Sequence, residues 1–308
     1  MFPIVTLTMN PALDIATDTE AIVPGHKLRC GEPRYDPGGG GINVARAIRL
    51  LGGDAMAVFP VGGLSGEMLC HLVANEGVPH ATVAIDGITR ESFAVAERQS
   101  GKQYRFLLPG PHIGARDQAR CLDELAAHLA GADYLVASGS LPPGCPAGFY
   151  ASIGDLARQH GARFVLDTSG PALSGAGRGA FLIKASLREL EELSGAEVRT
   201  ESDRGKAARK VIERGCAEIL VVSLGAEGAL LATREEIRPF PVISVPALSS
   251  VGAGDSMLAG IVLSLTRGWT LPDAVRFGMA AGTAALLRPG TELCRREDAD
   301  RLYRAAPR

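Results

Sequence analysis

Short apolar segments alternate with longer helical segments along most of the 308-residue chain. The apolar segments end at turn residues, which predicts buried strands at 4–9, 55–61, 134–138, 164–167, 181–184 and 219–224. Apolar residues at helical spacing predict helices at 43–51, 67–75, 118–130, 149–159, 203–214, 256–266, 273–287 and 298–304. Strands that alternate with helices form a parallel sheet with helices on both faces. We therefore expect an α/β fold, a three-layer α/β/α doubly wound arrangement around a mostly parallel sheet.

Two segments interrupt this alternation. Residues 92–99 and 102–108, joined at Ser100-Gly101, alternate polar and apolar side chains as a β-hairpin does. Residues 15–35 are extended and rich in turn residues, without helical periodicity. We expect one domain, 1–308, with lid inserts at about 15–35 and 88–108, because a sheet exposed on one face can close over a ligand site. Surface strands that face only solvent are the alternative.

Composition excludes several classes of function. The net charge of -2 gives no basic surface for nucleic acid. No apolar run reaches membrane-spanning length, and the N-terminal residues lack the charged start of a signal peptide, so we expect no membrane partner. The six cysteines show no Cys-x-x-Cys spacing, which indicates reduced thiols in a cytoplasmic protein.

The segment 249–256, Ser-Ser-Val-Gly-Ala-Gly-Asp-Ser, leads directly into a predicted helix. Gly252, Ala253 and Gly254 let the backbone come close to a ligand, because none has a side chain larger than a methyl group. The first N–H groups of the helix and its positive dipole end form an anion-binding site there. Asp255 is a candidate general base beside this site, so the segment suits phosphoryl transfer onto a hydroxyl. An ordinary strand-to-helix turn with Asp255 as a first-turn cap is the alternative.

A second glycine-rich segment, 36–47, has four consecutive glycines at 38–41. Each glycine loses more backbone entropy on ordering than other residues do, so the run predicts backbone that lies against a ligand. Asn43 offers a donor and an acceptor to a polyol, or is a plain helix N-cap. The segment is neither a dinucleotide-binding fingerprint nor a Walker loop, because it lacks both Gly-x-Gly-x-x-Gly and a closing Gly-Lys-Ser/Thr.

The two glycine-rich segments resemble the two signatures of the ribokinase-like (PfkB) family of carbohydrate kinases. The first runs from Gly38 through Asn43 to Gly62, and the second from Ser250 to Gly260. Shorter stretches at 6–8, 13–14, 27–30, 103–106, 138–144 and 222–225 are similar to the phosphofructokinase branch of the family. The resemblance covers essentially the whole chain. It implies a ribokinase-like fold and ATP-dependent phosphorylation of the C1 hydroxyl of fructose 6-phosphate to give fructose 1,6-bisphosphate.

The resemblance also implies roles for residues at the sugar site. Asp255 would be the base, and the amides of Gly252, Ala253 and Gly254 would stabilise the transferring phosphoryl group. The sugar hydroxyls would be held by Asp14, Gly39, Asn43 and Ser138. Lys27, Arg90 and Arg105 would contact the sugar phosphate, which carries about two negative charges. Without the resemblance, these three cationic residues read as solvated surface.

For the nucleotide, the resemblance implies that ATP contacts Lys184, Ser186, Ser223, Gly225, Gly228 and Thr283. Glu189 would help to hold Mg²⁺, largely through water. The family norm for 184–189 is Lys-Pro-Asn-x-x-Glu, and this chain has Ala185 for Pro and Ser186 for Asn, which places the tightness of Mg-ATP binding in doubt. The family further suggests a K⁺ site near Ser249, Val251, Ala285 and Gly290.

Several alternatives remain open at this point. A kinase of tagatose 6-phosphate or of fructose 1-phosphate would use the same lid cations and the same base. A catalytically impaired regulator that binds sugar phosphate is a different class, supported by the departure at Ser186. The family also implies a homodimer formed through the lid.

Overall fold

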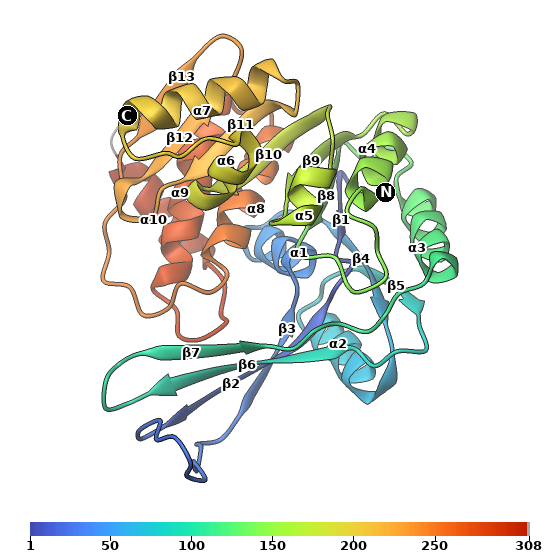
Figure 1. Cartoon of the computed structure of the whole chain (residues 1–308), viewed down its shortest axis with the longest axis vertical. Helices are drawn as coiled ribbons and strands as arrows, with labels where there is room; N and C mark the ends of the chain where they lie inside the picture. Colours follow the sequence, from blue (N-terminus) through green and yellow to red (C-terminus); the bar gives the residue numbers. More distant parts are fainter. Residues whose placement is uncertain (307–308) are drawn as a thin grey trace.

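The computed structural model describes residues 1–306 and contains two separate β-sheets (Figure 1). The larger sheet has nine strands, parallel except for β12 and β13 at one edge. In spatial order these are β13 (Ile237–Phe240), β12 (Ala229–Ala232), β11 (Ala217–Ser223), β10 (Ala180–Ser186), β9 (Arg163–Asp167), β8 (Tyr134–Ser138), β1 (Ile4–Leu7), β4 (Met56–Val61) and β5 (His80–Ala84).

Alternate residues of the central strands face two different hydrophobic cores, as the two-residue period of a strand requires. In β1, Ile4 faces one core whereas Val5 and Leu7 face the other. Helices of the first core are α1 (Gly40–Leu50), α2 (Gly63–Asn75), α8 (Ala253–Thr266), α9 (Leu271–Leu286) and α10 (Arg296–Ala305). Those of the second are α3 (Ala115–His128), α4 (Phe149–Gln159), α5 (Pro171–Gly175), α6 (Leu187–Ser194) and α7 (Glu201–Glu213). The predicted three-layer α/β/α arrangement is confirmed.

The smaller sheet, called the lid here, projects from the main body at the bottom of Figure 1. Its strands, in order, are β3 (Arg34–Gly38), β2 (Ala12–Thr19), β6 (Arg90–Glu97) and β7 (Gln103–Leu107). β6 and β7 pair in the antiparallel sense, so the predicted hairpin is confirmed. The lid strands therefore come from 12–38 and 90–107, which overlap the segments expected as inserts at about 15–35 and 88–108.

Five of the strands and α-helices were not predicted from the sequence: β5, β12, β13, α5 and α6. β12 and β13 are four residues long and α5 is five, too short for a periodicity to show. The helices at the two glycine-rich segments begin earlier than expected, α1 at Gly40 and α8 at Ala253. Their glycines thus belong to the first helical turn. Among residues 1–306, no helix is long and apolar enough to cross a membrane.

The chain leaves β1 in two opposite directions. It runs first to β4 and β5 on one side of β1, and later to β8, β9, β10 and β11 on the other side. Ligands of open α/β sheets bind at such a switch point, beyond the carboxyl ends of the strands. Asn10, which follows β1, and Ser140, which follows β8, meet there through a 3.1 Å hydrogen bond from Asn10 Nδ2 to Ser140 Oγ.

Candidate active site

Asp255 lies in the first turn of α8, whose N-cap is Gly252 in the left-handed conformation at φ 74°. Asp255 is therefore the third residue of the helix and not its N-cap. Instead, Asn43 Nδ2 donates a hydrogen bond of 3.0 Å to Asp255 Oδ2 across 212 residues of sequence. Asn43 is not a cap either, because the N-cap of α1 is Gly39. The two signature segments therefore meet at this hydrogen bond.

Burial and nearby charges both shift the pKa of Asp255. Burial and the neighbouring Asp167 carboxylate together raise the pKa of Asp255 to about 6, although Asn43 and Lys184 act in the opposite direction. Lys184 Nζ lies 3.1 Å from Asp167 Oδ2, and the pair is largely buried. Burial disfavours the Lys184 cation, but the carboxylates of Asp167, Asp255 and Glu189 outweigh it and raise the pKa of Lys184. The site thus keeps a permanent cation beside a carboxylate that titrates near pH 6.

The four glycines at 38–41 pack against the ends of strands rather than standing clear of the protein. A Cβ on Gly38 would lie 2.4 Å from the Asp14 carboxyl carbon, and one on Gly40 would lie 2.2 Å from Ser138 Oγ. A Cβ on Gly41 would lie 2.4 Å from the carbonyl oxygen of Leu7. Side chains would be excluded here by the protein itself. The run draws Asp14, Ser138 and Asn43 together at one place.

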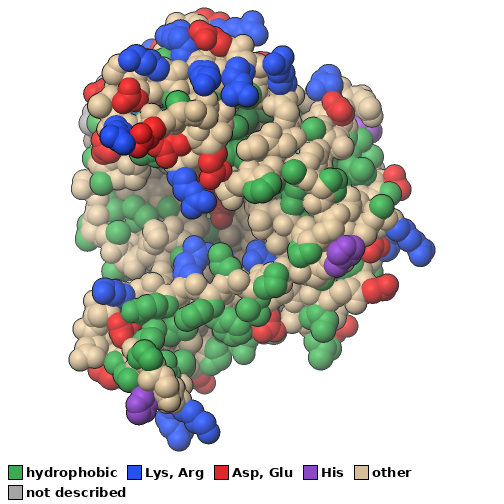
Figure 2. Space-filling view, in the orientation of Figure 1, with side chains coloured by type: hydrophobic (Ala, Val, Ile, Leu, Met, Phe, Trp, Pro, Cys, Tyr) green, Lys and Arg blue, Asp and Glu red, His purple; other side chains and the backbone are tan. Residues whose placement is uncertain are grey.

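Asp14 on β2 faces the cationic part of the lid. Burial outweighs the lowering effect of Arg90, Arg105 and Arg46 and raises the pKa of Asp14 to about 6. Arg90 is fixed by hydrogen bonds from Nε and Nη2 to the Asn10 carbonyl oxygen at 3.2 and 3.1 Å. Figure 2 shows a hollow between the main body and the lid, bordered by Lys and Arg side chains. Arg90 and Arg105 thus lie near the Asp14 carboxylate at the switch point.

Lys27 is the exception among the predicted sugar-site residues. It lies in the exposed segment beyond the bridge that joins Thr19 to Cys30 at the tip of the lid. At about 3.3 Å per residue, Thr19 is roughly 17 Å along β2 from Asp14. The structure therefore does not bring Lys27 together with Asp14, Arg90 and the other predicted sugar-site residues of the same chain.

A cavity of about 380 Å³ lies on the other side of the α8 N-terminus. Its lining includes Ser223, Gly225, Gly228 and Thr283, which are four of the predicted ATP residues, and it also includes Gly254. Gly225 and Gly228 bound a short 3₁₀ turn, Gly225–Glu227, and both have positive φ. A Cβ on Gly228 would lie 2.0 Å from the Phe240 carbonyl oxygen, so the turn requires glycine there. The cavity and the Asp255 site meet at Gly254.

Ser186 and Glu189 form a capping box at the start of α6. The Glu189 amide donates to Ser186 Oγ at 3.3 Å, and the Ser186 amide donates to Glu189 Oε2 at 2.6 Å. The serine that departs from the family norm therefore has a structural role of its own. The spacing Ser-x-x-Glu was a signal for this cap in the sequence.

The residues of the predicted K⁺ site lie in two adjoining loops. Ser249 Oγ donates to the Gly290 carbonyl oxygen at 2.7 Å, and the Val251 amide donates to Ser249 Oγ at 3.2 Å. The Ala285 carbonyl accepts from the Arg288 amide at 3.0 Å in the turn after α9. Arg34 of the lid reaches the same loops, with Nη1 2.9 Å from Glu292 Oε1.

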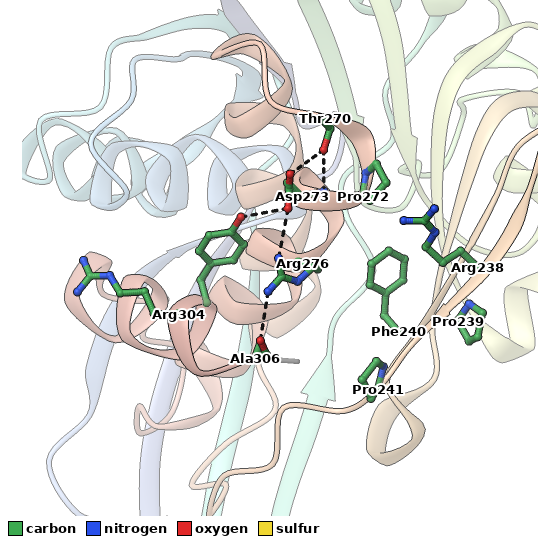
Figure 3. Close-up of a pocket in the computed structure, with 11 residues that line it drawn as sticks. Arg238, Pro239, Phe240, Pro241, Thr270, Pro272, Asp273, Arg276, Arg304 and Ala306 are labelled. Atoms are coloured by element: carbon green, nitrogen blue, oxygen red, sulfur yellow. Dashed lines mark hydrogen bonds and ion pairs between the residues drawn. The ribbon is translucent and has the colours of Figure 1, made fainter. Parts of the chain in front are cut away.

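A larger cavity, of about 1090 Å³, lies away from this site between β13, the start of α9 and the end of α10 (Figure 3). Three of its charged residues pair with neighbours. Arg276 Nη1 lies 3.2 Å from Asp273 Oδ1, the Thr270 hydroxyl also contacts Asp273, and Arg238 Nη2 lies 2.8 Å from Glu236 Oε2. It shares no lining residue with the 380 Å³ cavity. Volume alone therefore does not mark the place of the chemistry.

Two residues near the site were not identified from the sequence. Asp167 ends β9, and its position at the carboxyl end of a predicted parallel strand was a usable signal. Arg46 follows Asn43 by one helical turn, at a spacing that puts both side chains on one face of α1. Nothing in the sequence indicated that Arg46 would be buried.

The nine-stranded sheet with its four-stranded lid is the ribokinase-like fold, as predicted. The chain belongs to the pfkB family of carbohydrate kinases, whose profile matches residues 7–298. It is 52% identical to the ATP-dependent 6-phosphofructokinase isozyme 2 of Mycobacterium tuberculosis strain H37Rv, over 98% of this chain and 89% of that protein.

Two crystal structures of the phosphofructokinase-2 from Escherichia coli are similar to the whole chain. The structure in complex with potassium has a TM-score of 0.94 at 42% identity, and the one in complex with substrates and products has a TM-score of 0.93 at 43% identity. Each comparison covers 99% of both chains. The family resemblance derived from the sequence is confirmed.

Proposed function

We propose that this protein is an ATP-dependent 6-phosphofructokinase that transfers the γ-phosphoryl group of ATP to the C1 hydroxyl of fructose 6-phosphate. The observation that carries the proposal is the hydrogen bond between Asn43 and Asp255, placed between the cationic hollow under the lid and the 380 Å³ cavity. Similarity to 6-phosphofructokinases over nearly the whole chain supports it.

Asp255 is proposed as the base that takes the proton of the C1 hydroxyl, because its pKa near 6 leaves it ionised at neutral pH and able to accept a proton. The amides of Gly252, Ala253 and Gly254 stabilise the charge on the moving phosphoryl group, since the first N–H groups of α8 have no partner within the helix. Lid closure over the hollow excludes water and limits hydrolysis of ATP.

The polar groups of the sugar site divide between the hydroxyls and the phosphate. Asp14, Asn43, Ser138 and the Gly39 backbone are proposed to hold the sugar hydroxyls, and Arg90 and Arg105 the 6-phosphate. Because Lys27 lies at the lid tip, it is proposed to contact a sugar phosphate that is bound to another protomer. Lys184, Ser186, Ser223, Gly225, Gly228 and Thr283 are proposed to contact ATP.

The proposed metals fit the residues present. Among residues 1–306, no group of three or more His, Cys, Asp or Glu side chains could hold a metal alone. Mg²⁺ is ordinarily held by substrate phosphates with one or two carboxylates, so Mg²⁺ would arrive with ATP and use Glu189 through water. Carbonyl and hydroxyl oxygens at Ser249, Val251, Ala285 and Gly290 suit K⁺. Bound there, K⁺ would brace the loop that begins α8.

The lid also supports the proposed homodimer. Phe106 and Leu107, on the edge strand β7, are 52% and 61% exposed, and their side chains point to opposite faces of the sheet. Apolar residues on an unpaired edge are a surface for pairing with another chain. We propose a dimer formed lid to lid, and we expect a cytoplasmic location, where ATP and sugar phosphates occur and thiols such as the six free cysteines stay reduced.

The test is release of ADP from Mg-ATP with fructose 6-phosphate, tagatose 6-phosphate, fructose 1-phosphate and fructose compared side by side, in K⁺ and in Na⁺. We expect a clear preference for fructose 6-phosphate. Equal rates with fructose would refute recognition of the phosphate, and a preference for one of the other sugar phosphates would identify the related kinase instead. Binding of fructose 6-phosphate without ADP release would indicate a regulator.

A pair of lid variants sharpens this test. Arg90→Met should raise the KM for fructose 6-phosphate, because it removes a cation from the hollow. Arg98→Met is the matched control on the same segment, since Arg98 makes exposed ion pairs with Asp18 and Glu20 at 3.3 Å. An equal effect of the two variants would contradict the assignment of Arg90.

A further inference from the structure

We propose that Arg46 is a positioning residue that fixes the Asn43 amide and, through it, orients the Asp255 carboxylate for proton transfer. This inference rests on the proposed function. Arg46 is 4% exposed, which is unusual for an arginine unless it is fully paired. Among residues 1–306, Arg46 makes no hydrogen bond with Arg90 or Arg105, and it does not line the 380 Å³ cavity. The reason for its burial must therefore lie in its hydrogen-bond partners.

The guanidinium group of Arg46 has four hydrogen bonds. Nε and Nη2 donate to the two Glu76 oxygens at 2.7 and 2.6 Å, a bidentate pair at the C-terminal end of α2. Nη1 donates to the Pro37 carbonyl oxygen at 2.8 Å and to Asn43 Oδ1 at 3.0 Å. A planar guanidinium held at both ends has one orientation. Arg46 thus joins α2, the glycine run and α1 rigidly.

The contact with Asn43 decides which end of its amide faces Asp255. An asparagine side chain has an acceptor at one end and donors at the other, whereas an ionised carboxylate only accepts. Because Arg46 holds Oδ1, the Nδ2 group of Asn43 is directed at Asp255 Oδ2, 3.0 Å away. A reversed amide would set oxygen against carboxylate and NH₂ against guanidinium, which are two repulsive contacts. The polarity of the chain Glu76, Arg46, Asn43, Asp255 is therefore fixed at every step.

This polarity affects catalysis because the hydrogen bond from Asn43 favours the charged form of Asp255 and holds one carboxylate oxygen in place. A base must be ionised and correctly oriented before it accepts a proton. Lysine cannot replace Arg46, because a single ammonium group cannot meet a bidentate carboxylate, a carbonyl and an amide oxygen in fixed directions.

The test is a double-mutant cycle on kcat with Arg46→Met, Asn43→Ala and the combined variant, measured with Mg-ATP and fructose 6-phosphate. We expect Arg46→Met to lower kcat by about 10- to 100-fold, as loss of a hydrogen bond to a charged group does. Its acidic limb of the kcat–pH profile should move to higher pH, with the KM for ATP unchanged. In the Asn43→Ala background, Arg46→Met should change kcat by less than about twofold.

Arg49→Met is the matched control, because Arg49 lies on the same helix in an exposed ion pair, 3.5 Å from Asp54. It should leave kcat and its pH profile unchanged. If Arg46→Met does not fold, Arg46→Lys takes its place in the cycle under the same criteria. Equal effects of the arginine substitution in both backgrounds, or a loss of melting temperature without a change in kcat or in its pH profile, would overturn the inference. Failure of the unmodified protein to release ADP would instead refute the proposed function, and the inference with it.

Discussion

Replacement of Asp255 by asparagine should make the protein less active and more stable at the same time. The loss of the proposed general base is expected to lower kcat by about 10²- to 10⁴-fold. The gain in stability follows from the pKa of Asp255, which folding raises from 3.8 to about 6. At about 1.4 kcal/mol per pKa unit, holding this carboxylate ionised at neutral pH costs the folded state about 3 kcal/mol. Asparagine removes that cost and can still accept from Asn43.

Part of the gain is lost because Lys184 no longer has the Asp255 carboxylate beside it. We therefore expect Asp255→Asn to raise the free energy of unfolding by about 1–2 kcal/mol at pH 7.5, or the melting temperature by about 2–3 °C for a chain of this length. The sign follows from the raised pKa: the penalty is full above about pH 6 and disappears below about pH 4, where the carboxyl group is protonated in both states. The stability difference should thus shrink as the pH falls from 7.5 to 5.

Asp273 provides a matched control for this prediction. It occupies the same position in the first turn of α9 that Asp255 occupies in α8, but its carboxylate accepts a hydrogen bond from the Thr270 hydroxyl, and this bond is the first cause that lowers the pKa of Asp273. Asp273→Asn should therefore destabilise the protein at neutral pH and leave kcat unchanged. The measurements are thermal unfolding at both pH values and fructose 6-phosphate-dependent ADP release. An Asp255→Asn variant that is less stable than the unmodified protein at pH 7.5, or that keeps its activity, would refute the reasoning.

Three further predictions follow from the site. Because the pKa values of Asp14 and Asp255 are both near 6, kcat/KM for fructose 6-phosphate should fall as the pH drops below 6. The expected loss at pH 5 is about tenfold for each of the two groups that must be ionised. A flat profile from pH 5 to 7 would contradict both assignments. Ser186→Asn should lower the KM for ATP and keep α6 capped. Ser186→Ala should destabilise the protein by about 1 kcal/mol in thermal unfolding. An unchanged KM for ATP in Ser186→Asn would show that Ser186 is not part of the ATP site. Gly40→Ala should destabilise the protein by about 1–3 kcal/mol and raise the KM for the sugar, because the added Cβ would lie 2.2 Å from Ser138 Oγ. Unchanged stability and an unchanged KM would show that the glycine segment adjusts to a side chain at little cost.

Elements that follow a strong local pattern could be predicted from the sequence. The buried strands, the longer helices and the β6–β7 hairpin all have a clear periodicity, and the bounds of α4 match the expectation residue for residue. The starts of α1 and α8 could not be placed, because glycine is a poor helix former in general and yet forms the first turn at both ligand loops. Tertiary contacts decided there against local propensity.

The residues of the candidate site could likewise be predicted only in part. Asp255 and Asn43 could be singled out because each follows a run of small residues, but the hydrogen bond between them depends on how two distant helices pack. Lys27 lies far along the lid from Asp14, and no feature of the sequence gives that distance. The burial of Arg46 depends on Glu76, thirty residues further along the chain, and on the Pro37 carbonyl. Such long-range pairings leave no periodic trace.

The 212 residues that separate Asn43 from Asp255 also set when the site can exist during protein synthesis. A ribosome that adds about 5–20 residues per second completes Asp255 roughly 10–40 s after Asn43. The ion pair between Glu76 and Arg46 lies within the first quarter of the chain, so the Asn43 side-chain amide can already be oriented when α8 leaves the ribosome. A chain that ends before Asp255 holds the proposed sugar-binding residues without the proposed base. On the proposed role of Asp255, we therefore expect that nascent protein does not consume ATP before its fold is nearly finished.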